Sequence, residues 1–158
     1  MHPHQDPMTG LKNLESALSQ GFRMTRVPFT EDIYYVKDNG LYNKRYTYAR
    51  LTGLKVEQIV VLDENQPLDG LPCFCLFYGT VEKLRGQGKT TAFIEIILER
   101  FKKDLPGRYK EFFVEALIET DNDSSMAIAN KLFGASKHDG VDEHSGVPTR
   151  IWQTKYAK

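Results

Sequence analysis

The chain has 158 residues, of which 41% are hydrophobic and 27% are charged. This length fits one domain, so we expect residues 1–158 to share one core, which excludes collagen-like, disordered and small cysteine-framework proteins. Lys plus Arg and Asp plus Glu each total 21, so the formal net charge is zero. Because a neutral chain does not attract polyanions over long distances, we expect neither nucleic acid nor a membrane surface as a partner.

Two features of the sequence predict a cytoplasmic location. Cys73 and Cys75 lie two residues apart and cannot link distant segments, which suits a reducing compartment. No apolar run approaches the ~20 residues that a membrane span needs, and the opening MHPHQDPM lacks the apolar stretch of a secretion signal. We assign no function to His2, His4 or His144.

The first third of the chain carries the weakest structural signals. Apolar residues recur at helical spacing between positions 11 and 18, which predicts a helix with Thr9 at its start and Gly21 at its end. Residues 22–54 are rich in Tyr, Arg and Lys, with a turn signal at 38–40. Such alternation can form a single-stranded nucleic-acid surface, but the zero net charge favours half-buried strands.

The remaining two thirds alternate between strand and helix patterns. Continuous or alternating apolar runs predict strands, and apolar stripes with a period of 3.6 predict helices. In chain order, we expect strands at 56–63 and 71–81, a helix at 91–103, a strand at 111–119, a helix at 124–133 and a strand at 149–156. Turn residues between the first two strands predict antiparallel pairing, and residues 140–148 are expected to form a surface loop.

The segment RGQGKT, between a strand and a helix, is suited to binding an anion. Glycines allow the backbone to approach a phosphate closely, the helix start offers N–H groups, and the cations and the hydroxyl add further contacts. The candidate anion-binding residues are Arg85, Gly86, Gln87, Gly88, Lys89 and Thr90.

Gly88, Lys89 and Thr90 also match the closing half of the nucleotide-binding P-loop, G-x-x-x-x-G-K-[ST]. The opening glycine of that motif would fall on Lys83, and no separate early strand supplies the usual strand-helix-strand frame. A small P-loop-like protein that binds ATP or GTP is therefore an alternative.

A second motif follows the strand at 111–119, where Asn122-Asp123-Ser124-Ser125 opens the next helix and Gly134 follows it. A strand, R-x-x-G-x-(G/A), a helix, a strand and N-x-x-S at the head of a second helix resembles the GNAT superfamily of acyl-CoA-dependent N-acyltransferases. The resemblance covers residues 72–134 and the last strand. It implies an α/β fold with a mixed, mainly antiparallel central sheet flanked by helices.

The resemblance also implies a function and a division of the chain. Residues 55–158 would form the acyl-CoA-binding core, and residues 1–54 would shape the acceptor side. The activity would be direct transfer of an acetyl group from acetyl-CoA to an amine, on a small molecule or a protein, without a metal. A homodimer is compatible with this role.

Cofactor contacts follow from the resemblance position by position. The pantetheine arm would lie against the backbone near Tyr78 and Thr80, and the pyrophosphate on the N–H groups of residues 86–90. Thr90 stands where the family prefers Gly or Ala. Asn122 and Ser125 would contact the cofactor, although both residue types are also common helix caps.

Attack on a thioester needs a neutral amine, so a base must remove a proton from an ammonium group of pKa ~8 to 10. Glu115 and Glu119 alternate onto one face of their strand and are the candidate bases, although solvated carboxylates would alternate in the same way. Between them, Leu117 stands where several family members place a glutamate. Ala129 stands where many members carry a tyrosine that protonates the departing thiolate, so a non-catalytic acyl-CoA-binding module is a second alternative.

Overall fold

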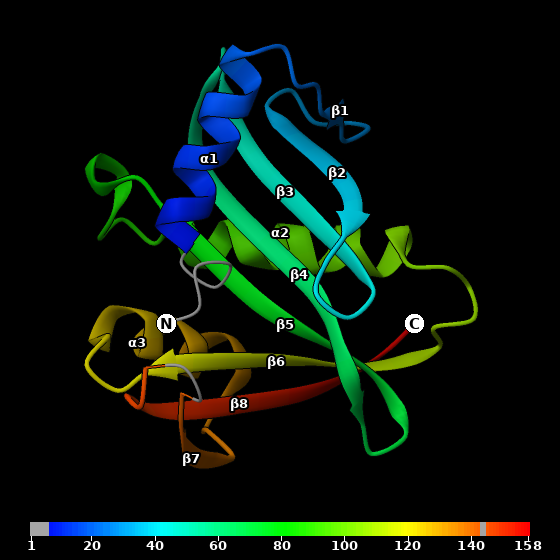
Figure 1. Ribbon diagram of the computed structural model, residues 1–158, viewed down its shortest axis with the longest axis vertical. Coiled ribbons are helices and arrows are strands. Elements are labelled where there is room, and N and C mark those ends of the chain that lie inside the picture. Colours follow the sequence, from blue (N-terminus) through cyan, green and yellow to red (C-terminus); the bar gives the residue numbers. More distant parts are fainter. Residues whose placement is uncertain (1–6, 143–144) are drawn as a thin grey trace.

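The structure is a computed structural model that describes residues 7–142 and 145–158, so His2, His4 and His144 lie outside the described residues. An eight-stranded sheet runs through the molecule (Figure 1). Helix α1 (Pro7–Ser19) lies against one face, and helices α2 (Lys89–Asp104) and α3 (Asp123–Phe133) lie against the other.

The strands follow the order β1-β2-β3-β4-β5-β6-β8-β7 in the sheet. All neighbouring strands are antiparallel except β5 and β6, which are parallel. The expected α/β fold with a mixed, mainly antiparallel sheet is therefore confirmed. The strands are β1 (Thr25–Arg26), β2 (Ile33–Asn39), β3 (Lys44–Thr52), β4 (Lys55–Leu68), β5 (Leu71–Thr80), β6 (Glu111–Glu119), β7 (His138–Val141) and β8 (Pro148–Ala157).

The larger hydrophobic core lies between the sheet and helices α2 and α3. Phe101 of α2 meets Phe74 and Phe112 edge to face, with ring centroids 4.9 Å and 5.7 Å away. These contacts follow from the two periodicities of the sequence, because every second residue of β5 and β6 meets the apolar stripe of α2. The fully buried or nearly buried residues of that stripe are Phe93, Ile94, Ile97, Leu98 and Phe101.

A smaller core lies under α1. Leu11 and Leu18 of that helix pack with Ala49, Leu51 and Ile59 of the sheet. The helix therefore covers β4 and β5 on the opposite face from α2 (Figure 1). The α1-side face of β6 is more open, since Leu117 is 42% exposed there.

β5 and β6 pair over only three residues before they separate. The paired residues are Cys73 with Phe113, Phe74 with Val114, and Cys75 with Glu115. Residues 76–80 continue β5 without a β6 partner, over about 13 Å at ~3.3 Å per residue. The two strands therefore enclose a gap in the backbone ladder that opens toward the starts of α2 and α3.

Several element boundaries differ from the sequence predictions. β4 runs to Leu68, so the expectation that it ends at Asp63 was wrong. The register of β4 on β5 shifts between Asn65 and Leu68, and this irregularity accommodates Pro67 within the strand. Helix α1 begins at Pro7, so Thr9 lies inside it. Proline favours the first helical turn because it has no N–H to leave unpaired.

Two further expectations were wrong. The segment 140–148 is not wholly a loop, because β7 includes Gly140 and Val141 and pairs with the start of β8. This strand is short, polar and at the sheet edge, where alternation is weak. In addition, the sequence analysis expected no strand-helix-strand frame around the P-loop-like motif. The structure has one, because β5, α2 and β6 form such a unit with parallel strands.

Candidate functional site

The loop before α2 leaves the start of that helix without a side-chain cap. Gly86 and Gly88 have φ values of +75° and +71°, a region in which residues with a Cβ are strained. Gly88 is the N-cap residue of α2, and among the described residues no side chain bonds to the first helical N–H groups. These N–H groups and the positive end of the helix dipole can therefore receive an anion.

The charged residues of this loop have different roles in the structure. The Nε of Arg85 donates to the carbonyl oxygen of Thr80 at 2.8 Å, and its Nη2 lies 3.5 Å from the sulfur of Met8 in α1. Arg85 thus fixes the end of β5. The exposed Lys89 makes no hydrogen bond or ion pair within the described part of the chain, so its ammonium is the loop cation that is available to a ligand.

The residues before the loop form a short 3-10 turn, η2 (Glu82–Leu84). The Nε2 of Gln87 donates to the carbonyl oxygen of Lys83 at 3.3 Å and ties the loop to this turn. Lys83 occupies the place of the opening P-loop glycine, and its backbone is committed to this turn.

The second expected cofactor contact lies at the start of α3, on the other side of the gap. The Oδ1 of Asn122 accepts from the N–H of Ser125 at 3.2 Å, so Asn122 caps the helix. The Tyr78 hydroxyl donates to the carbonyl oxygen of Ser125 at 2.9 Å and joins β5 to α3. Burial raises the pKa of Tyr78 to about 12, so this hydroxyl retains its proton near neutral pH.

The two candidate bases lie on one strand face but far apart. Glu115 belongs to the last residue pair between β5 and β6, at the closed end of the gap. Glu119 lies four residues further along β6, about 13 Å away, so one substrate amine cannot contact both carboxylates. The structure therefore separates Glu115 and Glu119 into two positions.

Gln153 of β8 is a neighbour of the candidate base Glu115 that the sequence analysis did not identify. It pairs directly with Glu115, and its Nε2 donates to the Oε2 of Glu115 at 2.6 Å. This hydrogen bond fixes the carboxylate of Glu115 beside the gap. The only signal in the sequence was the alternation of β8, which does not reveal the strand register.

The two cysteines lie in β5 beside Glu115, and both are buried. Burial, and secondarily the charge of Glu115, raises the pKa of each thiol to about 12. A thiol needs its thiolate form to act as a nucleophile. Neither Cys73 nor Cys75 is therefore suited to form an acyl-enzyme near neutral pH.

Ala129 is fully buried in α3 and offers no proton donor. The end of that helix is held by Trp152 of β8, whose indole N–H is 3.1 Å both from the Oδ1 of Asn130 and from the carbonyl oxygen of Gly134.

The described residues contain no group of three or more His, Cys, Asp and Glu side chains that could hold a metal ion. Among the helices that are described, none is both long and apolar enough to cross a membrane.

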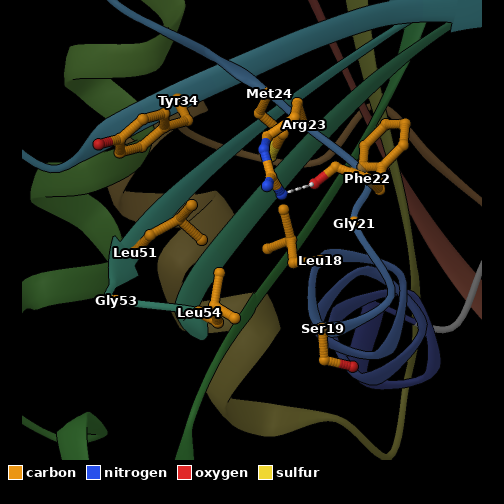
Figure 2. Close-up of a pocket in the computed structure, with 10 residues that line it drawn as sticks. All are labelled: Leu18, Ser19, Gly21, Phe22, Arg23, Met24, Tyr34, Leu51, Gly53 and Leu54. Atoms are coloured by element: carbon orange, nitrogen blue, oxygen red, sulfur yellow. Dashed lines mark hydrogen bonds between the residues drawn. The ribbon is translucent and has the colours of Figure 1, made fainter.

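A cavity of about 370 Å³ lies apart from the β5–β6 gap, between the end of α1 and the turn that joins β3 to β4. Figure 2 shows the Arg23 side chain at this cavity, where its Nη1 is 3.4 Å from the carbonyl oxygen of Phe22. Most of the other side chains that line it are apolar, and they include Leu18, Met24, Tyr34, Leu51 and Leu54.

Comparison with known proteins identifies the fold. No protein-family profile and no curated protein matches the sequence. Among solved structures, a GNAT-family acetyltransferase from Streptococcus pneumoniae matches with a TM-score of 0.54 and 13% identity, over 71% of this chain and 67% of that one. An IAA acetyltransferase from Bacillus cereus matches with a TM-score of 0.56 and 16% identity, over 71% of this chain and 78% of that one.

A ribosomal alpha-N-protein acetyltransferase, solved in complex with coenzyme A, matches with a TM-score of 0.53 and 13% identity. The match covers 70% of this chain and 61% of that one, so it spans less than two thirds of that protein. Together, the sheet order and these matches define an acyltransferase-like α/β architecture. More specifically, the chain has the fold of GNAT-family acetyltransferases, and the resemblance noted in the sequence is confirmed at that level.

Proposed function

We propose that this chain is an N-acetyltransferase that transfers an acetyl group directly from acetyl-CoA to an amine. One observation carries the proposal: the gap between β5 and β6 leads directly to the uncapped start of α2. A long, thin ligand with an amide-containing arm and a phosphorylated end suits both parts, because the strand edges offer backbone hydrogen bonds and the helix start offers N–H groups.

In this proposal the pantetheine arm lies along β5, near the backbone of Tyr78 and Thr80. The pyrophosphate lies on the N–H groups of residues 86–90, and Lys89 supplies the charge. Asn122 and Ser125 border the same gap from the start of α3 through their backbone and capping groups. With the phosphates at the loop, the thioester reaches the closed end of the gap, beside Glu115.

Glu115 is the better candidate for the general base because it lies at the closed end of the β5–β6 gap, where this proposal places the thioester. Glu119 lies near the open end of the gap. The Glu115 carboxylate accepts a proton from the ammonium, and the neutral nitrogen attacks the thioester carbonyl carbon. The carbon–sulfur bond then breaks, and the coenzyme A thiolate takes a proton from water. The resulting hydroxide takes the second proton of the nitrogen, which leaves the neutral amide, and Glu115 returns its proton to solvent. Water is the donor in this scheme because Ala129 has no hydroxyl and the Tyr78 hydroxyl donates to Ser125.

The test measures the release of free coenzyme A thiol from acetyl-CoA across a panel of small-molecule amines and peptide N-termini. Replacing a general base lowers turnover by about 10²- to 10⁴-fold. We expect Glu115→Gln to show such a loss in kcat while it still binds acetyl-CoA. Glu111→Gln is the matched control, since Glu111 shares the strand and the face but pairs with Lys155 at the far end. Equal turnover by Glu115→Gln and Glu111→Gln would show that Glu115 is not the general base.

Two alternatives have observations in their favour. The buried Ala129 favours a non-catalytic acyl-CoA-binding module, which would bind acetyl-CoA without turnover of any amine. The Gly88-Lys89-Thr90 motif, within a strand-helix-strand unit, favours a nucleotide-binding protein. Parallel calorimetric titrations with acetyl-CoA and with magnesium-ATP separate these classes, because binding of magnesium-ATP alone would contradict the acetyltransferase proposal.

A further inference from the structure

A chain of polar side chains runs from the residue before β2 across β3, β4 and β5, and it ends in the first turn of α2. The Nη1 of Arg50 lies 2.7 Å from the Oδ2 of Asp32, and its Nε donates to the Oε1 of Gln58 at 3.0 Å. The Nε2 of Gln58 is 3.4 Å from the Oγ1 of Thr80. The Oγ1 of Thr80 is in turn 2.6 Å from the Oγ1 of Thr90, in the first turn of α2.

The chemistry of these groups fixes the direction of the hydrogen bonds. Arginine can only donate, so the amide oxygen of Gln58 faces Arg50. The amide nitrogen of Gln58 therefore faces Thr80, and this nitrogen can only donate as well. Consequently, the hydroxyl oxygen of Thr80 acts as an acceptor toward Gln58.

Thr80 is only 5% exposed and Gln58 only 2%, so their polar hydrogens need partners inside the protein. The one side-chain acceptor within reach of the Thr80 proton, among the residues described, is the oxygen of Thr90. Thr80 thus donates to Thr90. The proton of Thr90 then points away from Thr80, and no described side chain or backbone group accepts it.

We propose that Thr90 donates its hydroxyl proton to a phosphate oxygen of the acetyl-CoA pyrophosphate, and that Gln58 and Thr80 are positioning residues that enforce this orientation. The inference rests on the proposed function and adds a group that the backbone N–H donors do not supply. A hydroxyl whose oxygen already accepts from Thr80 presents its proton to the ligand, which suits an anion.

The first test compares Thr90→Ala with Thr90→Ser, which keeps the hydroxyl. A hydrogen bond to a charged group is worth about tenfold or more in affinity, so we expect Thr90→Ala to raise the Kd for acetyl-CoA about tenfold and Thr90→Ser to stay near the parent protein. S-acetyl-pantetheine, which has the same thioester arm but no pyrophosphate, provides the second readout. Its kcat/KM should be the same in Thr90→Ala and in the parent protein.

The second test asks whether Thr80 acts through Thr90. Thr80→Val preserves the shape and removes the hydroxyl, so Thr90 loses its fixed orientation and we expect a several-fold weaker Kd, with recovery in Thr80→Ser. The double variant Thr80→Val/Thr90→Ala should bind no more weakly than Thr90→Ala alone, because the two substitutions act on the same contact between Thr90 and the phosphate. A melting temperature for each variant identifies any that fail to fold, and the Ser variants keep the test valid in that case.

The outcomes distinguish this inference from the function on which it rests. If the parent protein binds acetyl-CoA and Thr90→Ala binds it equally well, the Thr90 contact is refuted while the proposed function stands. If Thr80→Val and Thr90→Ala weaken binding additively, the positioning role of Thr80 is refuted. If the parent protein does not bind acetyl-CoA, both proposals fail.

Discussion

Gly88→Asp tests the phosphate site with little disturbance of the fold. Gly88 has a φ of +71°, and a Cβ added there meets no atom within 4 Å. A residue with a Cβ in this conformation costs about 1–2 kcal/mol, but aspartate tolerates it better than most residues and is a preferred N-cap. We therefore expect the variant to fold, with a melting temperature within a few degrees of the parent protein.

The effect on binding follows from the position of the new charge. A carboxylate about 5 Å from a phosphate is repelled by about 0.8 kcal/mol per unit charge at the dielectric constant of water and by about 3 kcal/mol at an effective value of 20. Two phosphate charges double these figures. A loss of about 1.6–6 kcal/mol corresponds to at least a tenfold rise in the Kd for acetyl-CoA.

Two controls accompany this measurement by calorimetric titration. Gly88→Asn has the same shape and capping ability without the charge, and should lose much less affinity. Gly70→Asp adds the same charge at a glycine with a φ of +78° and open surroundings, in the turn between β4 and β5, and should bind normally. The deficit of Gly88→Asp should also shrink as salt is raised, since ions screen exposed charges. Unchanged affinity in Gly88→Asp would refute the placement of the phosphates on this loop.

Three further predictions concern the core and the buried acids. Phe101→Ala should lower the free energy of unfolding in urea by about 3–5 kcal/mol, because its ring is fully buried among three aromatic side chains; a loss below 1 kcal/mol would contradict this packing. Cys73 and Cys75 should react with iodoacetamide at pH 8 about a thousandfold more slowly in the folded protein than in the urea-unfolded protein, since folding raises the thiol pKa from 9.0 to about 12. Equal rates in the two states would show that the thiols are accessible. The folded-state pKa values of both thiols and of Tyr78 lie above their unfolded values, so their contribution to stability is complete below pH ~9 and falls as the pH rises toward 12. Urea midpoints should therefore drop between about pH 9 and pH 11, and a flat profile would contradict the assigned burial.

The sequence predicts the elements that carry strong apolar periodicity and the loop between them. Helices α2 and α3 and strands β5, β6 and β8 are each within a few residues of their expected bounds, because each buries one continuous apolar face. The glycine loop is also readable, since positive φ angles at Gly86 and Gly88 require that residue type.

The rest depended on tertiary pairing. β7 was missed because a short polar edge strand has no apolar alternation, and β4 was cut short because a proline at a pairing irregularity resembles a turn. The pairs Glu115–Gln153 and Gln58–Thr80 arise from the register of β6 on β8 and of β4 on β5. A shift of one residue would place these side chains on opposite faces, and local sequence does not determine that shift.

The short parallel junction between β5 and β6 has a consequence for amide hydrogen exchange. Along residues 76–80, alternate backbone N–H groups point toward β4, where they are paired, and toward the gap, where no strand pairs with them. Amide protons of the second set should exchange with solvent much faster than their neighbours, which gives an every-second-residue pattern of protection along one strand. A ligand that lies in the gap would erase this alternation and leave a footprint that can be read residue by residue.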